Sequence, residues 1–164
     1  DLLILRLQQN YQDDEIKALH QRASDWYVSR GMIIDAIDHA FKADDIPKIV
    51  KLVETNIFAV LDQGRIRTLR SWLDAIPAVY KSDHPWLNIA HALVLVYAGY
   101  IENGEEALKL AEESLPGAAK GESNQIKAYI YAIRAYYLWI KGYNEESGEL
   151  ASKALALIAD EEFI

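Results

Sequence analysis

Four glycines each end a stretch of helical hydrophobic periodicity, and their spacing constrains the fold of this 164-residue chain more than any other feature. They are Gly31, Gly64, Gly99 and Gly142, which lie 33, 35 and 43 residues apart. Glycine adopts the left-handed conformation that closes a helix and lets the chain reverse. A recurrence of this length is typical of arrays of helical hairpins. We therefore expect an all-α fold of about four antiparallel helix pairs.

Apolar residues recur at spacings of three and four along almost the whole chain, which predicts helices and no strands. At the first helix, Asp13 and Asp14 are expected to cap the free amide groups. The predicted helices span about 14–30, 33–43, 46–63, 66–76, 85–99, 103–115, 124–141 and 145–159. The eight residues from Pro116 to Ser123 are expected to form a loop, which accounts for the longest interval between glycines.

Small residues recur five and twelve positions after the glycines, where two helices of a hairpin must approach closely. These positions hold Ala36 and Ala43, Gly104 and Ala111, and Ser147 and Ala154, but Leu69 and Ile76 in the second repeat. The second hairpin is therefore expected to be splayed wider. The pattern resembles the tetratricopeptide repeat, which implies a right-handed superhelix (solenoid) of hairpins at about 14–43, 46–76, 85–115 and 124–159.

The composition argues against several functions. Seventeen lysines and arginines stand against 25 acidic residues, for a net charge of −8, so we expect no nucleic-acid contact by this segment. The absence of cysteine excludes disulfides and thiol catalysis. The apolar run from Ala92 to Gly99 is too short to cross a membrane. The first residues lack a signal peptide and an initiator methionine, so we expect a cytoplasmic segment of a longer protein.

No spacing of reactive side chains indicates catalysis or a metal. The four histidines, His20, His39, His84 and His91, do not form the pairs that zinc sites use. Adjacent residues on a helix point about 100° apart, so the glutamate pairs are expected to be solvated helix faces. These pairs are Glu105/Glu106, Glu112/Glu113, Glu145/Glu146 and Glu161/Glu162. A phosphate loop is not expected after Gly99, because two glutamates follow Gly104.

Three distinctive elements follow one another along the chain, at residues 1–8, 19–31 and 69–77. In this order they resemble the large, ATP-binding, maltose-regulon-activator-like transcriptional regulators of the LuxR type. "LHQRASDWYVSRG" (Leu19–Gly31) with "AIDHAF" is similar to the family's junction into its repeats, although Gln21 replaces a common basic residue. "LRSWLDAIP" (Leu69–Pro77) is similar to a second family element. "DLLILRLQ" resembles the end of a winged-helix-like module. The resemblance implies that residues 1–12 end such a module and that 13–164 form the helical-repeat domain.

The resemblance also implies a role. The parent protein would carry an ATPase module before this segment, where ATP binds, and a helix-turn-helix after it. This segment would be a non-catalytic sensor that needs no cofactor of its own, with a small-molecule inducer or a protein as partner. His20, Ser24 and Asp25 are then scaffold residues. Further repeats are expected after Phe163 and Ile164, and the exposed end could pair with a second copy.

In repeats of this class the first helix of each hairpin lines the concave surface. Its inward positions in the last two hairpins hold the predicted ligand- or partner-binding residues Trp86, Tyr97, Tyr129, Tyr136 and Trp139, together with Ile89, Leu93, Val96, Ala132 and Ile140. Aromatic rings with hydroxyl groups suit sugar rings or an apolar peptide. The alternative is that these rings pack against a neighbouring repeat.

Two other functions stay open. The chain could be a peptide-binding or assembly adaptor of tetratricopeptide-like repeats, unrelated to transcription. An all-helical enzyme has less support, because no spacing arranges a nucleophile, a base and an orienting group.

Overall fold

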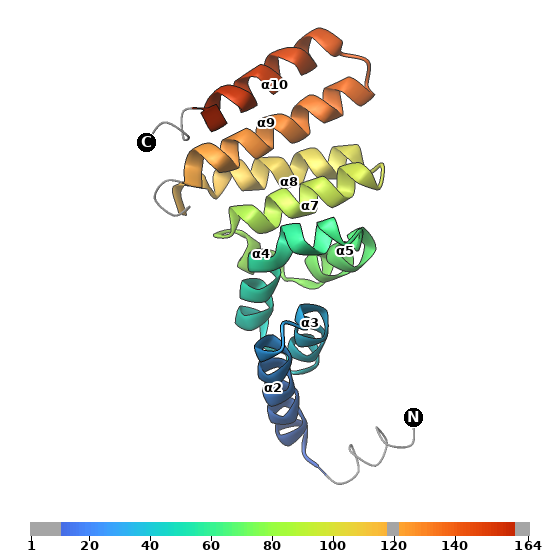
Figure 1. Ribbon diagram of the computed structural model, residues 1–164, viewed down its shortest axis with the longest axis vertical. Helices are drawn as coiled ribbons and strands as arrows, with labels where there is room; N and C mark the ends of the chain where they lie inside the picture. Colours follow the sequence, from blue (N-terminus) through green and yellow to red (C-terminus); the bar gives the residue numbers. More distant parts are fainter. Residues whose placement is uncertain (1–10, 118–121, 160–164) are drawn as a thin grey trace. The chain divides into compact units, whose positions relative to one another are not determined.

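The computed structural model describes residues 11–117 and 122–159 (Figure 1). These ranges hold helices α2 to α10 and one 3-10 helix, and no residue within them is in a strand. The α-helices are α2 (Asp13–Ser29), α3 (Ile33–Lys42), α4 (Ile46–Asp62), α5 (Ile66–Ala75), α6 (Ala78–Lys81), α7 (Pro85–Tyr97), α8 (Ile101–Glu113), α9 (Glu122–Ile140) and α10 (Asn144–Ala159). The all-α class is confirmed for this part of the chain, whereas the right-handed superhelix of four hairpins stays a prediction.

Each predicted helix boundary lies within two residues of the observed one. The predicted loop at 116–123 is partly wrong, because Leu115–Gly117 form a 3-10 helix and Glu122 already begins α9. Residues 118–121 of that loop lie outside the described residues, as do residues 1–10 of the expected preceding module and the Phe163–Ile164 end. At α2 the expected aspartate cap is also wrong. Gln12 precedes the helix, and its N–H donates to Glu15 Oε2 at 2.9 Å.

The short helix α6 was not predicted. It has four residues, which is too short for a hydrophobic period, and it follows Pro77 in an extended conformation. The buried Asn88 of α7 holds the chain just here, because its side-chain N–H donates to the carbonyl oxygen of Lys81 at 2.9 Å. This hydrogen bond, between residues seven positions apart, connects the segment between α5 and α7 to α7 itself.

All four turn glycines have the predicted left-handed conformation. Their φ angles are 71° at Gly31, 68° at Gly64, 83° at Gly99 and 86° at Gly142. A side chain at such a φ is strained, so these positions favour glycine for backbone reasons alone.

The structure divides into two compact units, and the boundary between Phe58 and Ala59 lies within α4. In the first unit α2 packs against α3. Its buried apolar residues are Ala36, Ile37, Ala40, Ala43, Ile49, Val50, Val53 and Ile57. Two ion pairs add to this packing, one between Lys17 and Asp44 at 3.1 Å and one between Lys48 and Asp25 at 2.7 Å. The first hairpin thus combines an apolar interior with exposed ion pairs.

The second unit contains two complete hairpins, α7 with α8 and α9 with α10, which lie side by side in Figure 1. Helix α9 packs on both α7 and α8, and α5 packs on α7. The core between the hairpins is apolar and includes Ile89, Leu95, Ala107, Leu108, Ala111, Ile126, Ile130 and Ile133. This packing places the first helices of successive hairpins, α7 and α9, next to each other.

The expected small residues occur where hairpin helices approach most closely. In the first hairpin, Ser24 lies seven residues before the turn glycine and Ala36 lies five residues after it. Ser24 Oγ donates to Ala36 O at 2.8 Å. The last hairpin repeats this contact with the roles exchanged, because Ser147 Oγ donates to Ala135 O, also at 2.8 Å. In the hairpin between them, a Cβ atom on Gly104 would lie 3.3 Å from Ala92 O. The prediction of close approach at the fifth position after the glycine is confirmed in these three hairpins.

Candidate functional site: an aromatic face on α7 and α9

The five predicted binding residues lie on two adjacent helices of the second unit. Trp86 and Tyr97 come from α7, whereas Tyr129, Tyr136 and Trp139 come from α9. Spacings of 11 residues on α7 and of 7 and 3 on α9 keep the members of each set on one side of their helix. We call these five residues the aromatic face.

The rings of the aromatic face contact one another between the two helices. Trp86 lies edge-on to Tyr129, with 5.3 Å between ring centroids. Tyr97 lies 5.8 Å from Tyr136, and Tyr136 stacks on Trp139 at 5.9 Å. These are favourable distances for aromatic pairs. The structure thus joins the predicted residues into one cluster at each end of the face.

Several of these rings are open to solvent. Trp139 is 61% exposed and Tyr97 is 57% exposed, whereas Trp86 is partly buried against the core. The prediction was wrong at Ile89 and Val96, which are 2% and 4% exposed and belong to the core between the hairpins. Those two side chains point between α7 and its neighbours, so they cannot contribute to an open surface. The five rings of the aromatic face provide apolar surface that an incoming molecule could cover.

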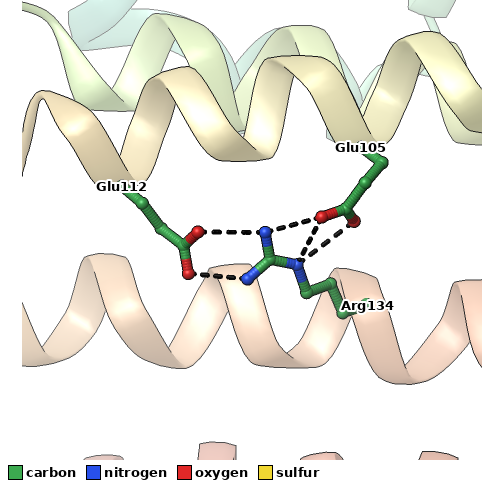
Figure 2. Close-up of polar contacts among 3 residues, drawn as sticks. All are labelled: Glu105, Glu112 and Arg134. Carbon is green, nitrogen blue, oxygen red and sulfur yellow. Dashed lines mark hydrogen bonds and ion pairs between the residues drawn. The ribbon is translucent and has the colours of Figure 1, made fainter.

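An arginine of α9 bridges two glutamates of α8 (Figure 2). Arg134 bonds to Glu105 and to Glu112, with its Nη2 and Nη1 atoms each 2.6 Å from a carboxylate oxygen. Burial opposes the charge of Arg134, but the hydrogen bonds that the guanidinium donates to both glutamates outweigh this effect and raise its pKa. The expectation that Glu105 and Glu112 are solvated is therefore wrong, because both are partly buried and accept hydrogen bonds from Arg134 of α9, whereas their neighbours Glu106 and Glu113 are exposed.

A separate groove of about 430 Å³ lies between α5, α7 and α8. It is lined by Arg70, Asp74, His91, Leu95, Tyr100, Asn103, Glu106, Ala107 and Leu110. The guanidinium of Arg70 lies 4.4 Å from the ring centre of Tyr100, and His91 Nε2 lies 2.9 Å from Asp74 Oδ1. Burial lowers the pKa of His91, so its neutral form is favoured. The sequence did not predict this groove, because its residues come from three helices that meet only when the chain packs.

The residues of the Leu19–Gly31 segment have structural partners. Ser24 is fully buried and donates to Ala36 O, and Asp25 pairs with Lys48 on α4. His20 Nδ1 lies 2.9 Å from His39 Nδ1. The serine hydroxyl and the aspartate therefore have separate partners and do not form a charge relay.

The described ranges contain no cluster of metal ligands and no membrane-spanning helix. Among residues 11–117 and 122–159, no three histidine or acidic side chains lie close enough together to hold a metal ion. In the same ranges, no helix combines the length and the apolar character that crossing a bilayer requires.

The chain is similar to segments of two kinds of larger protein. It is 22% identical to the HTH-type transcriptional regulator MalT of Serratia proteamaculans over 144 residues, which is 88% of this chain and 16% of that protein. It is 32% identical to the serine/threonine-protein kinase PknK of Mycobacterium tuberculosis and of Mycobacterium bovis over 114 residues, 65% of this chain and 10% of the kinase. No family model and no solved structure matches the chain. It is therefore distantly related to a segment of a transcriptional regulator and to a segment of a kinase.

Proposed function

We propose that the chain is a non-catalytic sensor or interaction segment of a LuxR-type transcriptional regulator. The aromatic face would bind a small-molecule inducer or a protein partner. The observation that carries the proposal is the contact between aromatic residues of two successive hairpins on one partly open surface. The similarity to MalT over 88% of the chain and the order of the three sequence elements support the regulator as the parent protein.

The size of the face favours an extended ligand. Trp86 and Tyr97 are 11 residues apart on one helix, which corresponds to about 16 Å at a rise of about 1.5 Å per residue. A molecule that contacts both clusters must span that distance. An oligosaccharide or a peptide segment does so, whereas a single sugar ring reaches only one cluster. The tyrosine hydroxyls would supply hydrogen bonds and the rings apolar contact.

Binding would act on parts of the parent protein outside this segment. An effector shifts a conformational equilibrium only if it binds one state more tightly than another. The face would therefore bias the arrangement of an ATP-binding module and a DNA-binding module in a cytoplasmic regulator. In this proposal the segment itself binds neither ATP nor nucleic acid. Self-association of two copies of the chain is a second way in which the segment could change the arrangement of the other modules.

Titration with defined probes tests the face. The 164-residue chain is titrated calorimetrically with a panel of mono- to tetrasaccharides and of short apolar peptides. Tyr136→Ala and Trp139→Ala should each weaken a detected interaction by about tenfold, as expected for loss of one ring contact. Tyr80→Ala is the matched control, because Tyr80 and Tyr136 are both 39% exposed and Tyr80 lies on α6. Unchanged binding in both face variants would contradict the proposal.

A second candidate is a peptide-binding or assembly adaptor of tetratricopeptide-like repeats. The similarity to PknK favours it, because a kinase as well as a regulator contains a segment of this kind. The complete open reading frame of the parent protein separates the candidates. A phosphate loop before the segment and a helix-turn-helix after it support the regulator, whereas a parent without either supports the adaptor.

A further inference from the structure

Two histidines face each other across the first hairpin. His20 of α2 and His39 of α3 place their Nδ1 atoms 2.9 Å apart, with ring centroids 5.0 Å apart. This is a hydrogen-bond distance, so one nitrogen must donate an N–H and the other must accept it with its lone pair. The ring of Tyr27 also lies close to that of His39, with 5.2 Å between their centroids.

The number of protons on the pair decides whether this contact can exist. With both rings neutral, one Nδ1 carries the proton and the other accepts. With one ring protonated, the charged ring still donates to the neutral one, in a charge-assisted hydrogen bond. With both rings protonated, two N–H groups and two positive charges face each other, and no acceptor is left. The contact therefore tolerates the first added proton and fails at the second.

The surroundings hold the pair back from full protonation. Burial, followed by the charge of Lys42, lowers the pKa of His39, while Asp35 and Asp38 on the same helix oppose this effect. Burial, then His39 and then Lys42 lower the pKa of His20. Since the two rings interact, the pair binds two added protons in two successive steps, and neither step can be assigned to one histidine alone. The second proton therefore binds less readily than the first.

The hairpin has a second cross-helix hydrogen bond that does not titrate. Ser24 Oγ donates to Ala36 O at 2.8 Å, and neither group changes its protonation between neutral and mildly acidic pH. One acid-sensitive and one acid-insensitive bond thus connect the same two helices.

We propose that the His20–His39 pair makes the packing of α2 on α3 dependent on pH. The hairpin is closed when the pair carries no added proton or one, and it opens locally when the pair binds a second proton. Acid would then loosen the first unit of the chain through a defined contact.

Hydrogen exchange of the α2 and α3 amides at pH 7.5 and pH 5.0 tests this, with protection factors corrected for the intrinsic exchange rates. The protection of these amides should fall by about fivefold at the lower pH, the effect of losing one hydrogen bond. His20→Gln should remove most of this pH dependence, and His39→Gln serves if that variant does not fold. Ser24→Ala is the matched control, because it should lower protection by the same factor at both pH values and keep the wild-type fall. Equal wild-type protection at the two pH values, or a full fall retained in the histidine variant, would overturn the proposal.

Discussion

Gly104 on α8 leaves room that a side chain of α7 occupies. A Cβ atom at this position would lie 2.6 Å from Val96 Cγ2 and 3.3 Å from the carbonyl oxygen of Ala92. The first distance is far below ordinary van der Waals contact, and Val96 is itself buried. The glycine therefore sets how closely the two helices of this hairpin approach, unlike the turn glycines, which have open space where a side chain would lie.

Replacing this glycine tests the close approach. Gly104→Ala should lower the free energy of unfolding by about 1–2 kcal/mol, because overpacking outweighs the better helix propensity of alanine. Gly148→Ala on α10 is the control, since no atom lies within 4 Å of its Cβ position, and it should stabilise by about 0.5–1 kcal/mol. Urea unfolding measures both. If Gly104→Ala also stabilises the chain, the two helices do not pack as closely as described.

At the scale of helices, the Arg134 bridge connects two hairpins. Glu105 and Glu112 are seven residues apart on α8, so they lie on the same side of that helix, and Arg134 of α9 lies between them (Figure 2). The side chain of Arg134 is 19% exposed and that of Glu112 is 39% exposed. The ion pairs are thus neither fully buried nor freely solvated. Their contribution to the free energy of unfolding should lie between the values typical of buried and of exposed ion pairs.

Removing the arginine should leave two carboxylates facing an apolar helix. We expect Arg134→Met to lower the free energy of unfolding by about 1–3 kcal/mol. Adding Glu105→Gln and Glu112→Gln should recover part of this loss, because the unpaired charges are then absent. Lys153→Met on an exposed position of α10 should change stability by less than about 0.5 kcal/mol. Thermal unfolding of the wild type and the three variants gives the comparison, and equal effects of Arg134→Met and Lys153→Met would rule out a stabilising bridge.

The elements that could be predicted from sequence are those with local signals. Turn glycines and the helical hydrophobic period are local, so helix ends were placed within two residues. The pairing of Arg134 with Glu105 and Glu112 could not be predicted, because it joins residues 22 and 29 positions apart whose helices meet only on packing. The same holds for the groove between α5, α7 and α8. For the aromatic face, the repeat resemblance places its residues on the first helices of two hairpins, but it did not show that Val96 points into the core.

At the scale of the whole molecule, the net negative charge of the segment argues against a direct part in the DNA binding that is proposed for its parent protein. The chain has 25 acidic and 17 basic residues, and some of the basic groups, such as Arg134 and Lys48, are already paired with carboxylates. Binding to a duplex depends on neutralising phosphates with free lysine and arginine side chains. A surface with this balance repels a phosphate backbone at low salt. We therefore expect that, if the parent protein binds DNA, another part of it supplies that contact.

Fluorescence anisotropy with a labelled duplex of about 30 base pairs tests this expectation directly. At about 150 mM salt the 164-residue chain should show no binding up to about 100 µM, the weak end of ordinary non-specific affinity. A triple variant provides the control: Glu145→Lys, Glu146→Lys and Glu149→Lys lower the net negative charge from −8 to −2 and gather three positive charges in the first turns of α10. This variant should bind the duplex measurably at low salt and lose that binding as salt rises, because its affinity comes from counterion release. Salt-sensitive binding by the unmodified chain below about 10 µM would contradict the charge argument and favour a nucleic-acid contact within this segment.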